Sequence, residues 1–174
     1  MIASPFDFFW TRMPADIGTL QLLVFFTLLC LLCGALALID IRRGIIPNRL
    51  NLSIAVLGLI KAIIAGGAMA GIEAGCEGVA IGAIFWLLRR LYFALRKTQG
   101  LGLGDVKFLA AAGPWIGIAG LPALLLIATL AALAAAGGLQ LAGRNMTRQS
   151  SLPFGPFLAL GLLLTVVLQQ FLEL

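Results

Sequence analysis

Long apolar stretches separated by short polar ones run along the whole chain and predict a series of membrane-spanning helices. A helix needs about 20 predominantly apolar residues to cross a bilayer. One uncharged stretch, 108–143, is too long for a single crossing, and the glycines and proline of 117–122 predict a turn inside it. The pattern therefore predicts about six spans, at 17–39, 50–70, 78–95, 106–118, 122–142 and 154–171.

The third of these stretches is the least regular. Its uncharged part, 78–88, would form only about 16 Å of helix, which is about half of the hydrocarbon thickness. We expect the helix to continue past Arg89 and Arg90, because long basic side chains can extend to the headgroups while their stems stay in the apolar layer. The end of this helix is then expected to project beyond the membrane.

The composition supports a helical membrane protein. Hydrophobic residues make up 61% of the 174 residues and charged residues only 11%, which is more apolar surface than a soluble domain of this length can bury. The alternating pattern of barrel strands is absent from the sequence. The first apolar stretch is too long for the core of a signal peptide, so we expect it to be retained. The predicted fold class is all-α, a polytopic bundle with 1–174 as a single integral-membrane domain.

Basic residues are concentrated in three segments, which predicts the topology. Ten of the twelve Lys and Arg residues lie in 40–51, 89–107 and 144–153, and the alternation of spans puts these segments on one side. The positive-inside rule makes that side the cytoplasm and places both termini outside. The net charge of +5 then needs no nucleic acid partner. Of the other two, Arg12 lies in an outer segment. Lys61 lies inside the second span, where a charge is costly, and a functional and a structural role are both open.

Several kinds of active site are excluded by what the sequence lacks. The chain has no His, so it cannot contain a Ser-His or Cys-His couple or a His-based metal site. Cys30 and Cys33 form a Cys-x-x-Cys within the first apolar stretch, where neither a second pair nor polar surroundings support a zinc or redox role. We interpret both as packing residues and predict no metal and no cofactor.

Asp40 and Asp105 are the only acids in the basic segments, and the predicted topology places both at the cytoplasmic face. An acid near a membrane is costly unless it is paired or functional. Two carboxylates held close together cannot both ionise easily, so they share a proton. An aspartic protease needs this state, because one carboxylate takes a proton from water and the other gives one to the scissile carbonyl. The helix dipole favours charge on Asp105, at the start of the fourth span, and therefore Asp105 as the base.

The two acids could also have roles without catalysis. Asp40 could pair with Arg42 or Arg43, and Asp105 could simply cap the fourth helix, a position that favours Asp. The pair could instead be a proton relay in a small proton-coupled membrane transporter. Inverted repeats would favour that function, but the two halves of the sequence show no convincing similarity. In a non-catalytic subunit of a pilus or secretion assembly, both acids would be replaceable.

Three motifs occur in order along the chain. Asp40 is followed by Ile-Pro-Asn at 46–48, Gly-x-Gly-Asp occupies 102–105, and Pro-Phe-Gly-Pro-Phe-Leu-Ala-Leu-Gly occupies 153–161. This combination resembles the type IV prepilin peptidases, a family of intramembrane aspartic proteases, from the first predicted span to the sixth. The resemblance implies an endopeptidase that removes the short basic leader of prepilins or pseudopilins. Cleavage would occur at the cytoplasmic face of the bacterial inner membrane, typically just after a glycine.

The resemblance also implies roles for particular residues. Asp40 and Asp105 correspond to the catalytic pair. Residues expected to bind the substrate or to shape the site are Gly102, Gly104, Lys107, Pro47, Asn48, Pro153, Gly155 and Pro156. Glycines beside Asp105 would let a peptide approach closely, and Pro47 would hold the connection that follows Asp40.

One departure from the family pattern concerns a second activity. Many members carry an amino-terminal domain with paired Cys-x-x-Cys motifs, which is associated with methylating the new N-terminus. This sequence shows no such pair before its first span, so we expect peptidase activity without methylation. The expected partners are a prepilin or pseudopilin substrate and membrane lipid.

Overall fold

The computed structural model describes residues 15–97, 102–141 and 153–172, and these residues form four helices. Their bounds are α2 Ala15–Arg43, α3 Asn48–Arg96, α4 Leu103–Leu141 and α5 Gly155–Leu172. No strand occurs within the described ranges. The predicted all-α fold class is therefore confirmed.

The outer surface of the bundle is apolar, as a membrane protein requires. In the part of the chain that the structure describes, three helices are long and apolar enough to cross a membrane, within Leu20–Arg43, Asn48–Arg96 and Leu103–Leu141. Large side chains such as Leu31 and Val79 are mostly exposed on these helices. Contiguous apolar surface of this kind is unusual on a soluble monomer, but it is favourable in contact with lipid tails.

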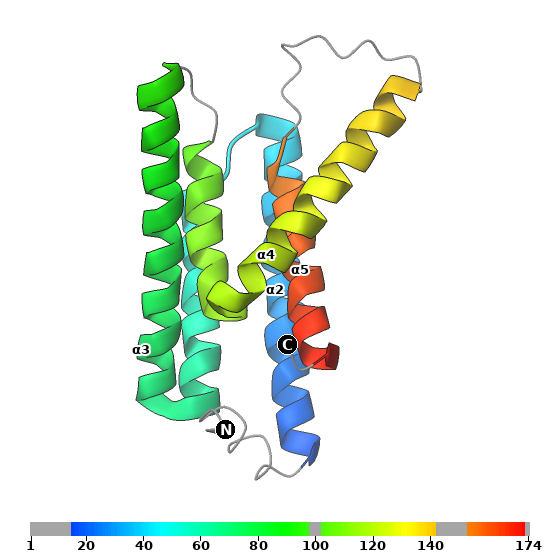
Figure 1. The fold of residues 1–174 in the computed structure, drawn as a ribbon. Coiled ribbons are helices and arrows are strands. Elements are labelled where there is room, and N and C mark those ends of the chain that lie inside the picture. Colours follow the sequence, from blue (N-terminus) through cyan, green and yellow to red (C-terminus); the bar gives the residue numbers. More distant parts are fainter. Residues whose placement is uncertain (1–14, 98–101, 142–152, 173–174) are drawn as a thin grey trace.

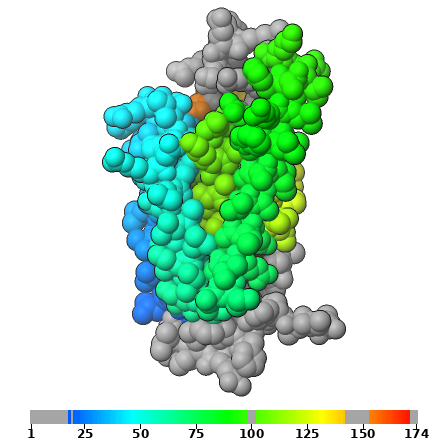
Figure 2. All heavy atoms as spheres, turned by 90° about the vertical axis from the view of Figure 1, so that its left-hand side faces the viewer, coloured from blue at the N-terminus to red at the C-terminus, as the bar shows by residue number. Residues whose placement is uncertain are grey.

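α3 folds back on itself at Gly67. This residue has a φ of 76° inside the long helix, a left-handed conformation that glycine adopts without steric cost. The chain turns there, and its first arm, 48–66, runs beside its second arm, 68–96 (Figure 1). Figure 2 shows the two arms lying together on one face of the molecule.

α4 is broken in the same way at Gly117, where φ is 66°. The predicted turn within 117–122 is confirmed, although a single residue makes it. The first arm, 103–116, forms about 21 Å of helix and ends partway along the bundle, and the second arm runs back at an angle (Figure 1). In Figure 2 this first arm is visible between the two arms of α3, in the upper half of the molecule only.

The start predicted for the third span is wrong. The sequence predicts it near residue 78, with a polar connection before it, but the second arm of α3 follows Gly67 directly and 68–77 is helical. Glu73 and Glu77 suggest a loop, yet both line a cavity between helices, and Glu77 accepts a hydrogen bond from the backbone N–H of Ile118. The helix does continue past Arg89 and Arg90 as predicted, ending at Arg96.

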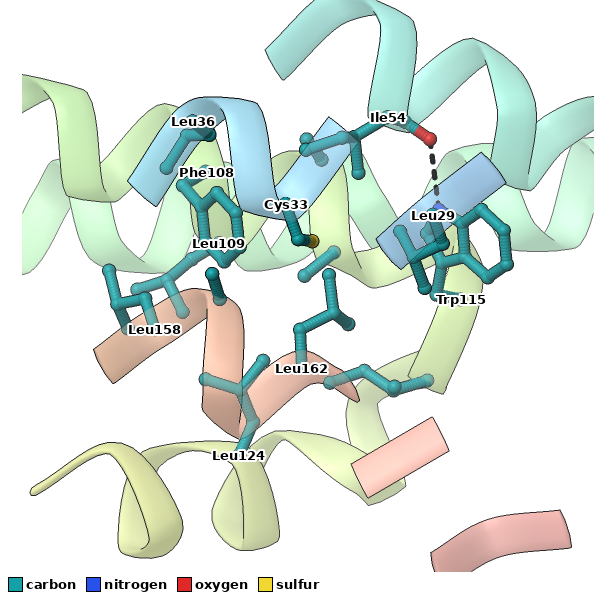
Figure 3. Close-up of a cluster of buried hydrophobic side chains, with 14 of the residues drawn as sticks. Leu29, Cys33, Leu36, Ile54, Phe108, Leu109, Trp115, Leu124, Leu158 and Leu162 are labelled. Atoms are coloured by element: carbon teal, nitrogen blue, oxygen red, sulfur yellow. Dashed lines mark hydrogen bonds between the residues drawn. The ribbon is translucent and has the colours of Figure 1, made fainter. Parts of the chain in front are cut away.

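All four helices contribute to one hydrophobic core (Figure 3). Trp115 of α4 lies in it and donates its indole N–H to the carbonyl of Ile54 in α3, at 2.9 Å. Cys33 is 1% exposed and packs there, as predicted for a packing residue. The remaining core side chains labelled in Figure 3 are Leu29, Leu36, Phe108, Leu109, Leu124, Leu158 and Leu162.

Glycines bring α3 and α4 unusually close. A Cβ added to Gly113 of α4 would lie 2.5 Å from the Cα of Gly78 in α3. Membrane helices use such small residues to pack backbone against backbone. This close contact holds the first arm of α4 against the second arm of α3 and positions the start of α4, where Asp105 lies.

Candidate active site

A cavity of about 980 Å³ lies at the end of the bundle where α2 ends and where α3 and α4 begin. Both Asp40 and Asp105 line it. The structure therefore brings together two carboxylates that are far apart in the sequence. The cavity is also lined by Ile41, Gly44, Ile45, Ile46, Asn48, Gly102, Leu103, Gly104, Lys107, Pro153 and Phe154.

Asp40 lies near the C-terminal end of α2 and is only 5% exposed. Its Oδ2 accepts a hydrogen bond from the backbone N–H of Gly155, at 2.9 Å. Because Gly155 is the first residue of α5, Asp40 lies at the N-terminus of that helix, where a negative charge is stabilised. The chain then leaves α2 through Gly44, whose N–H donates to the carbonyl of Asp40 and whose φ is 61°.

Asp105 lies in the first turn of α4 and is partly buried. Its side chain is hydrogen-bonded to the backbone of Gly102, and it is close enough to Asp40 for the two charges to interact. The two glycines of the motif leave room for this arrangement. A Cβ on Gly102 would lie 2.9 Å from Oδ2 of Asp105, and one on Gly104 would lie 3.1 Å from the Cβ of Ile46.

The predicted residues Pro47, Asn48 and Lys107 lie at the starts of two helices. Pro47 is extended and stands at the N-cap of α3, where its missing N–H costs nothing. The ammonium of Lys107 donates to Oδ1 of Asn48 at 2.9 Å, across 59 positions of the sequence. This bond ties α4 to α3 beside the carboxylates.

The motif near the C-terminus forms another wall of the cavity. Pro153 and Phe154 line it, and the Phe154 ring packs on Phe157 with 6.4 Å between centroids. A Cβ on Gly155 would lie 2.6 Å from Oδ2 of Asp40, so glycine allows the close approach of α5 to this carboxylate.

Three of the predicted site residues do not line the cavity themselves: Pro47, Gly155 and Pro156. Pro47 begins α3, and Gly155 acts through its backbone N–H on Asp40. Pro156 lies in the first turn of α5. Its position there is typical of proline, whose fixed φ suits the start of a helix.

Several apolar residues of the site were not predicted. Ile41, Ile45 and Leu103 line the cavity and are substantially exposed. The only sequence signal for them is their position beside the motifs, since apolar residues are common everywhere in this chain. The wall of the cavity is therefore partly polar and partly apolar.

The chemistry of this arrangement follows from its two carboxylates. When two such groups share a cavity, their titrations are coupled, and one can hold a proton while the other is ionised. The pair can then act as general acid and general base. The structure thus defines a class of protein, a helical membrane protein with paired carboxylates at one end of its bundle.

Comparison with known proteins identifies the family. The model of the type IV leader peptidase family matches residues 23–137, a range that includes Asp40 and Asp105. The chain belongs to this family, and the resemblance inferred from its motifs is confirmed. No solved structure matches the chain significantly.

Curated relatives carry the name prepilin leader peptidase/N-methyltransferase. One from Burkholderia pseudomallei is 39% identical over 135 residues, which cover 76% of this chain and 42% of the relative. One from Xanthomonas campestris is 33% identical over 131 residues, covering 72% and 43%. One from Escherichia coli is 35% identical over 127 residues, covering 72% and 55%. The chain spans about half the length of the curated relatives it matches.

Proposed function

We propose that this chain is a membrane-embedded aspartic endopeptidase that cleaves the leader peptide from type IV prepilins or pseudopilins. One observation carries the proposal, namely that Asp40 and Asp105 line the same cavity within the segment matched by the leader peptidase family. The names of the relatives supply the substrate class. The alternative of a proton-coupled transporter has no support from the comparisons.

In the reaction, the ionised carboxylate removes a proton from a water molecule, and the resulting hydroxide attacks the scissile carbonyl carbon. The protonated carboxylic acid gives its proton to the carbonyl oxygen, so a neutral tetrahedral diol forms. Breakdown of the diol returns a proton to the leaving amine and regenerates the acid and its carboxylate. The two residues thus exchange roles within one turnover and need to remain close throughout.

We infer a division of labour between the two acids other than the one that the sequence suggests. The helix dipole argues for Asp105 as the ionised base, but Asp40 also lies at a helix N-terminus and accepts the N–H of Gly155 there. We propose instead that Asp40 is the base and that Asp105 holds the shared proton. A bound N–H donor stabilises the charged form of a carboxylate more than the neutral form.

The walls of the cavity fit a substrate that is partly in water and partly in lipid. Ile41 and Ile45 are 61% and 63% exposed and offer an apolar entrance for the segment that follows the leader. The backbone at Gly102 and Gly104 has no side chains to hinder an extended peptide. The leader, which is basic in this family, would lie outside the membrane.

For the topology, we propose six membrane-embedded helical segments, of which the first arm of α4 is a short one, with both termini outside and the active site at the cytoplasmic face of the bacterial inner membrane. The reversals of α3 at Gly67 and of α4 at Gly117 support this count, because each divides one long helix into two arms. Arg42 and Arg43 lie in the last turn of α2, beside the carboxylates, which supports the cytoplasmic side. The basic segment 144–153 lies outside the described residues except for its last one.

We also propose that cleavage, and not methylation, is the activity of the described part of the chain. The matching family model is that of leader peptidases, whereas the relatives' names join two activities. The two carboxylates that line the cavity support acid–base chemistry there.

The test is a cleavage assay with the purified full chain in lipid nanodiscs and a candidate prepilin. We expect one cut at the leader junction, identified by the mass of both products, without addition of a metal or S-adenosylmethionine. Cleavage that persists when both acids are replaced by Asn would contradict the aspartic mechanism. Transfer of a labelled methyl group to the product would contradict the second proposal.

A further inference from the structure

A second polar cavity lies in the half of the bundle away from the carboxylate pair. It encloses about 540 Å³ and is lined by Lys61, Glu73, Glu77 and Gln169, among others. Lys61 comes six residues before the turn at Gly67 and Glu73 six residues after it, so the two lie at the same level of the α3 hairpin. This turn is at the bottom of Figure 1, whereas α2 ends and α3 begins at the top.

The short first arm of α4 creates this space, because it ends at Gly117 before reaching that end of the bundle. The break frees backbone groups, and two of the polar side chains bind them. Gln169 donates to the carbonyl of Ile116 at 2.8 Å, and Glu77 accepts from the N–H of Ile118 at 3.4 Å. These contacts explain why the cavity contains Gln169 and, in part, why it contains Glu77. They do not explain the presence of Lys61 and Glu73.

Lys61 and the two carboxylates face one cavity without pairing. The amine of Lys61 lies 5.3 Å from the centre of the Trp115 ring, and among the described residues the structure contains no ion pair between it and Glu73 or Glu77. Charged groups inside a membrane are costly unless each has a partner. The separation therefore leaves room for a ligand that carries both a negative and a positive group.

An apolar cavity of about 240 Å³ adjoins the polar one. It lies between α2 and α5, with Leu22, Phe25 and Val166 in its walls, and it shares Lys61 and Trp115 with the polar cavity. The Lys61–Trp115 pair thus stands at a boundary, with a charged space on one side and an apolar space on the other. A ligand that fits both spaces is amphipathic.

We propose that the two cavities together bind one zwitterionic phospholipid whose headgroup ends in a primary ammonium. Its phosphate would accept hydrogen bonds from Lys61, its ammonium would lie between Glu73 and Glu77, and one acyl chain would occupy the space between α2 and α5. A primary ammonium offers three donors to carboxylates, which a choline group lacks. A glycerol headgroup would leave both carboxylates without a cation.

This site is independent of the proposed peptidase function, since it lies in the other half of the bundle and shares no lining residue with the carboxylate cavity. The bound lipid would fill the space that the short first arm of α4 leaves open at that end of the bundle. Its expected effect is on the retention of lipid and on stability, and neither measurement requires a cleavage assay.

The test is native mass spectrometry of the full chain released from nanodiscs that contain equal amounts of ethanolamine, choline and glycerol phospholipids. We expect one ethanolamine phospholipid to be retained preferentially. We expect two variants to reduce this retention about ten-fold each: the single variant Lys61→Met and the double variant Glu73→Gln with Glu77→Gln. A reduction of about ten-fold corresponds to the loss of one hydrogen bond to a charged group. Lys97→Met, which removes an exposed amine at the end of α3, is the matched control and is expected to retain the lipid.

Soluble O-phosphoethanolamine, added at the same concentration as the ethanolamine phospholipid, separates binding of the headgroup alone from binding of the whole lipid. Its failure to displace the retained lipid is expected, because it cannot fill the apolar cavity. Equal retention of the three lipids, no retention by the wild type, or unchanged retention by both cavity variants would overturn the proposal. Glu73→Gln alone, at an exposed position on the rim, keeps the test valid if Lys61→Met does not fold.

Discussion

The backbone N–H of Gly155 donates a hydrogen bond of 2.9 Å to Oδ2 of Asp40, across 115 positions of the sequence. The bond joins the N-terminus of α5 to the C-terminal end of α2. It also fixes the direction of one carboxylate of the pair, because Asp40 is almost fully buried and has little freedom to turn elsewhere. The third sequence motif therefore acts on the site through its backbone.

Gly155→Ala is expected to lower the rate of cleavage about a hundred-fold with little loss of folded protein. The added Cβ would lie 2.6 Å from Oδ2 of Asp40, so the carboxylate has to move, and a displacement of about 1 Å at a catalytic group costs about that factor. The measurement is kcat with a prepilin substrate. Gly138→Ala is the control, since nothing lies within reach of a Cβ there, and equal rates for the two variants would refute the positioning role.

Asp40→Asn and Asp105→Asn are each expected to reduce cleavage by several orders of magnitude, while insertion and helix content stay unchanged. The double variant should be little worse than either single one, because the pair acts as a unit. If the fold reductions in rate of the two single variants multiply in the double variant, the two residues have independent roles. Asparagine keeps the shape of each side chain and removes only the ionisable group.

The same pair predicts a bell-shaped dependence of kcat/KM on pH. Activity is lost at low pH, where both carboxyl groups are protonated and no base remains, and at high pH, where both are ionised and no acid remains. The two apparent constants belong to the pair. A profile that rises to a plateau, with no loss on the alkaline side, would contradict the need for a protonated partner.

The bond between Lys107 and Asn48 is expected to contribute about 1 kcal/mol to the free energy of unfolding, the usual net size of an intramolecular hydrogen bond. A double-mutant cycle with Lys107→Met and Asn48→Ala measures this coupling in detergent. We expect each single variant to reduce activity as well, because the bond holds the starts of α3 and α4 together. The same cycle made with Lys97→Met in place of Lys107→Met should give no coupling.

Gly113→Ala is expected to destabilise the bundle by about 1–3 kcal/mol, the usual cost of overpacking. The added methyl would meet the backbone of Gly78 at 2.5 Å, and a backbone cannot move aside as a side chain can. Gly34→Ala in α2 meets nothing within 4 Å and is expected to be neutral or slightly stabilising. Thermal unfolding of the two variants compares them directly, and equal melting temperatures would rule out the close contact of α3 and α4.

Reporter fusions test the proposed topology. Fusions after Asn48, Thr98 and Gln149 are expected to report the cytoplasm, and fusions after Glu73 and at the C-terminus the outside, as the distribution of basic residues requires. Because Glu73 lies within a helix, a second fusion at Gly67 checks that side at the turn itself. Opposite locations for Asn48 and Thr98 would separate Asp40 from Asp105 and exclude a shared site.

Features that depend on local composition are predictable from the amino-acid sequence alone. Stretches of apolar residues long enough for a membrane predict helices wherever they occur. The glycines and proline of 117–122 predict a turn, and Gly117 breaks α4 there. Asp40 and Asp105 are conspicuous because acids are rare among the basic segments, and the motifs around them are sufficient to recognise the family.

Contacts between helices, in contrast, depend on how the chain packs. The helical state of 68–77 could not be predicted, because Glu73 and Glu77 resemble loop residues until a cavity and the N–H of Ile118 accommodate them. The contact of Gly155 with Asp40 and the approach of Lys61 to Trp115 join different helices. Apolar periodicity says which segments enter the membrane, but almost every face of these helices is apolar, so only packing selects the faces that meet.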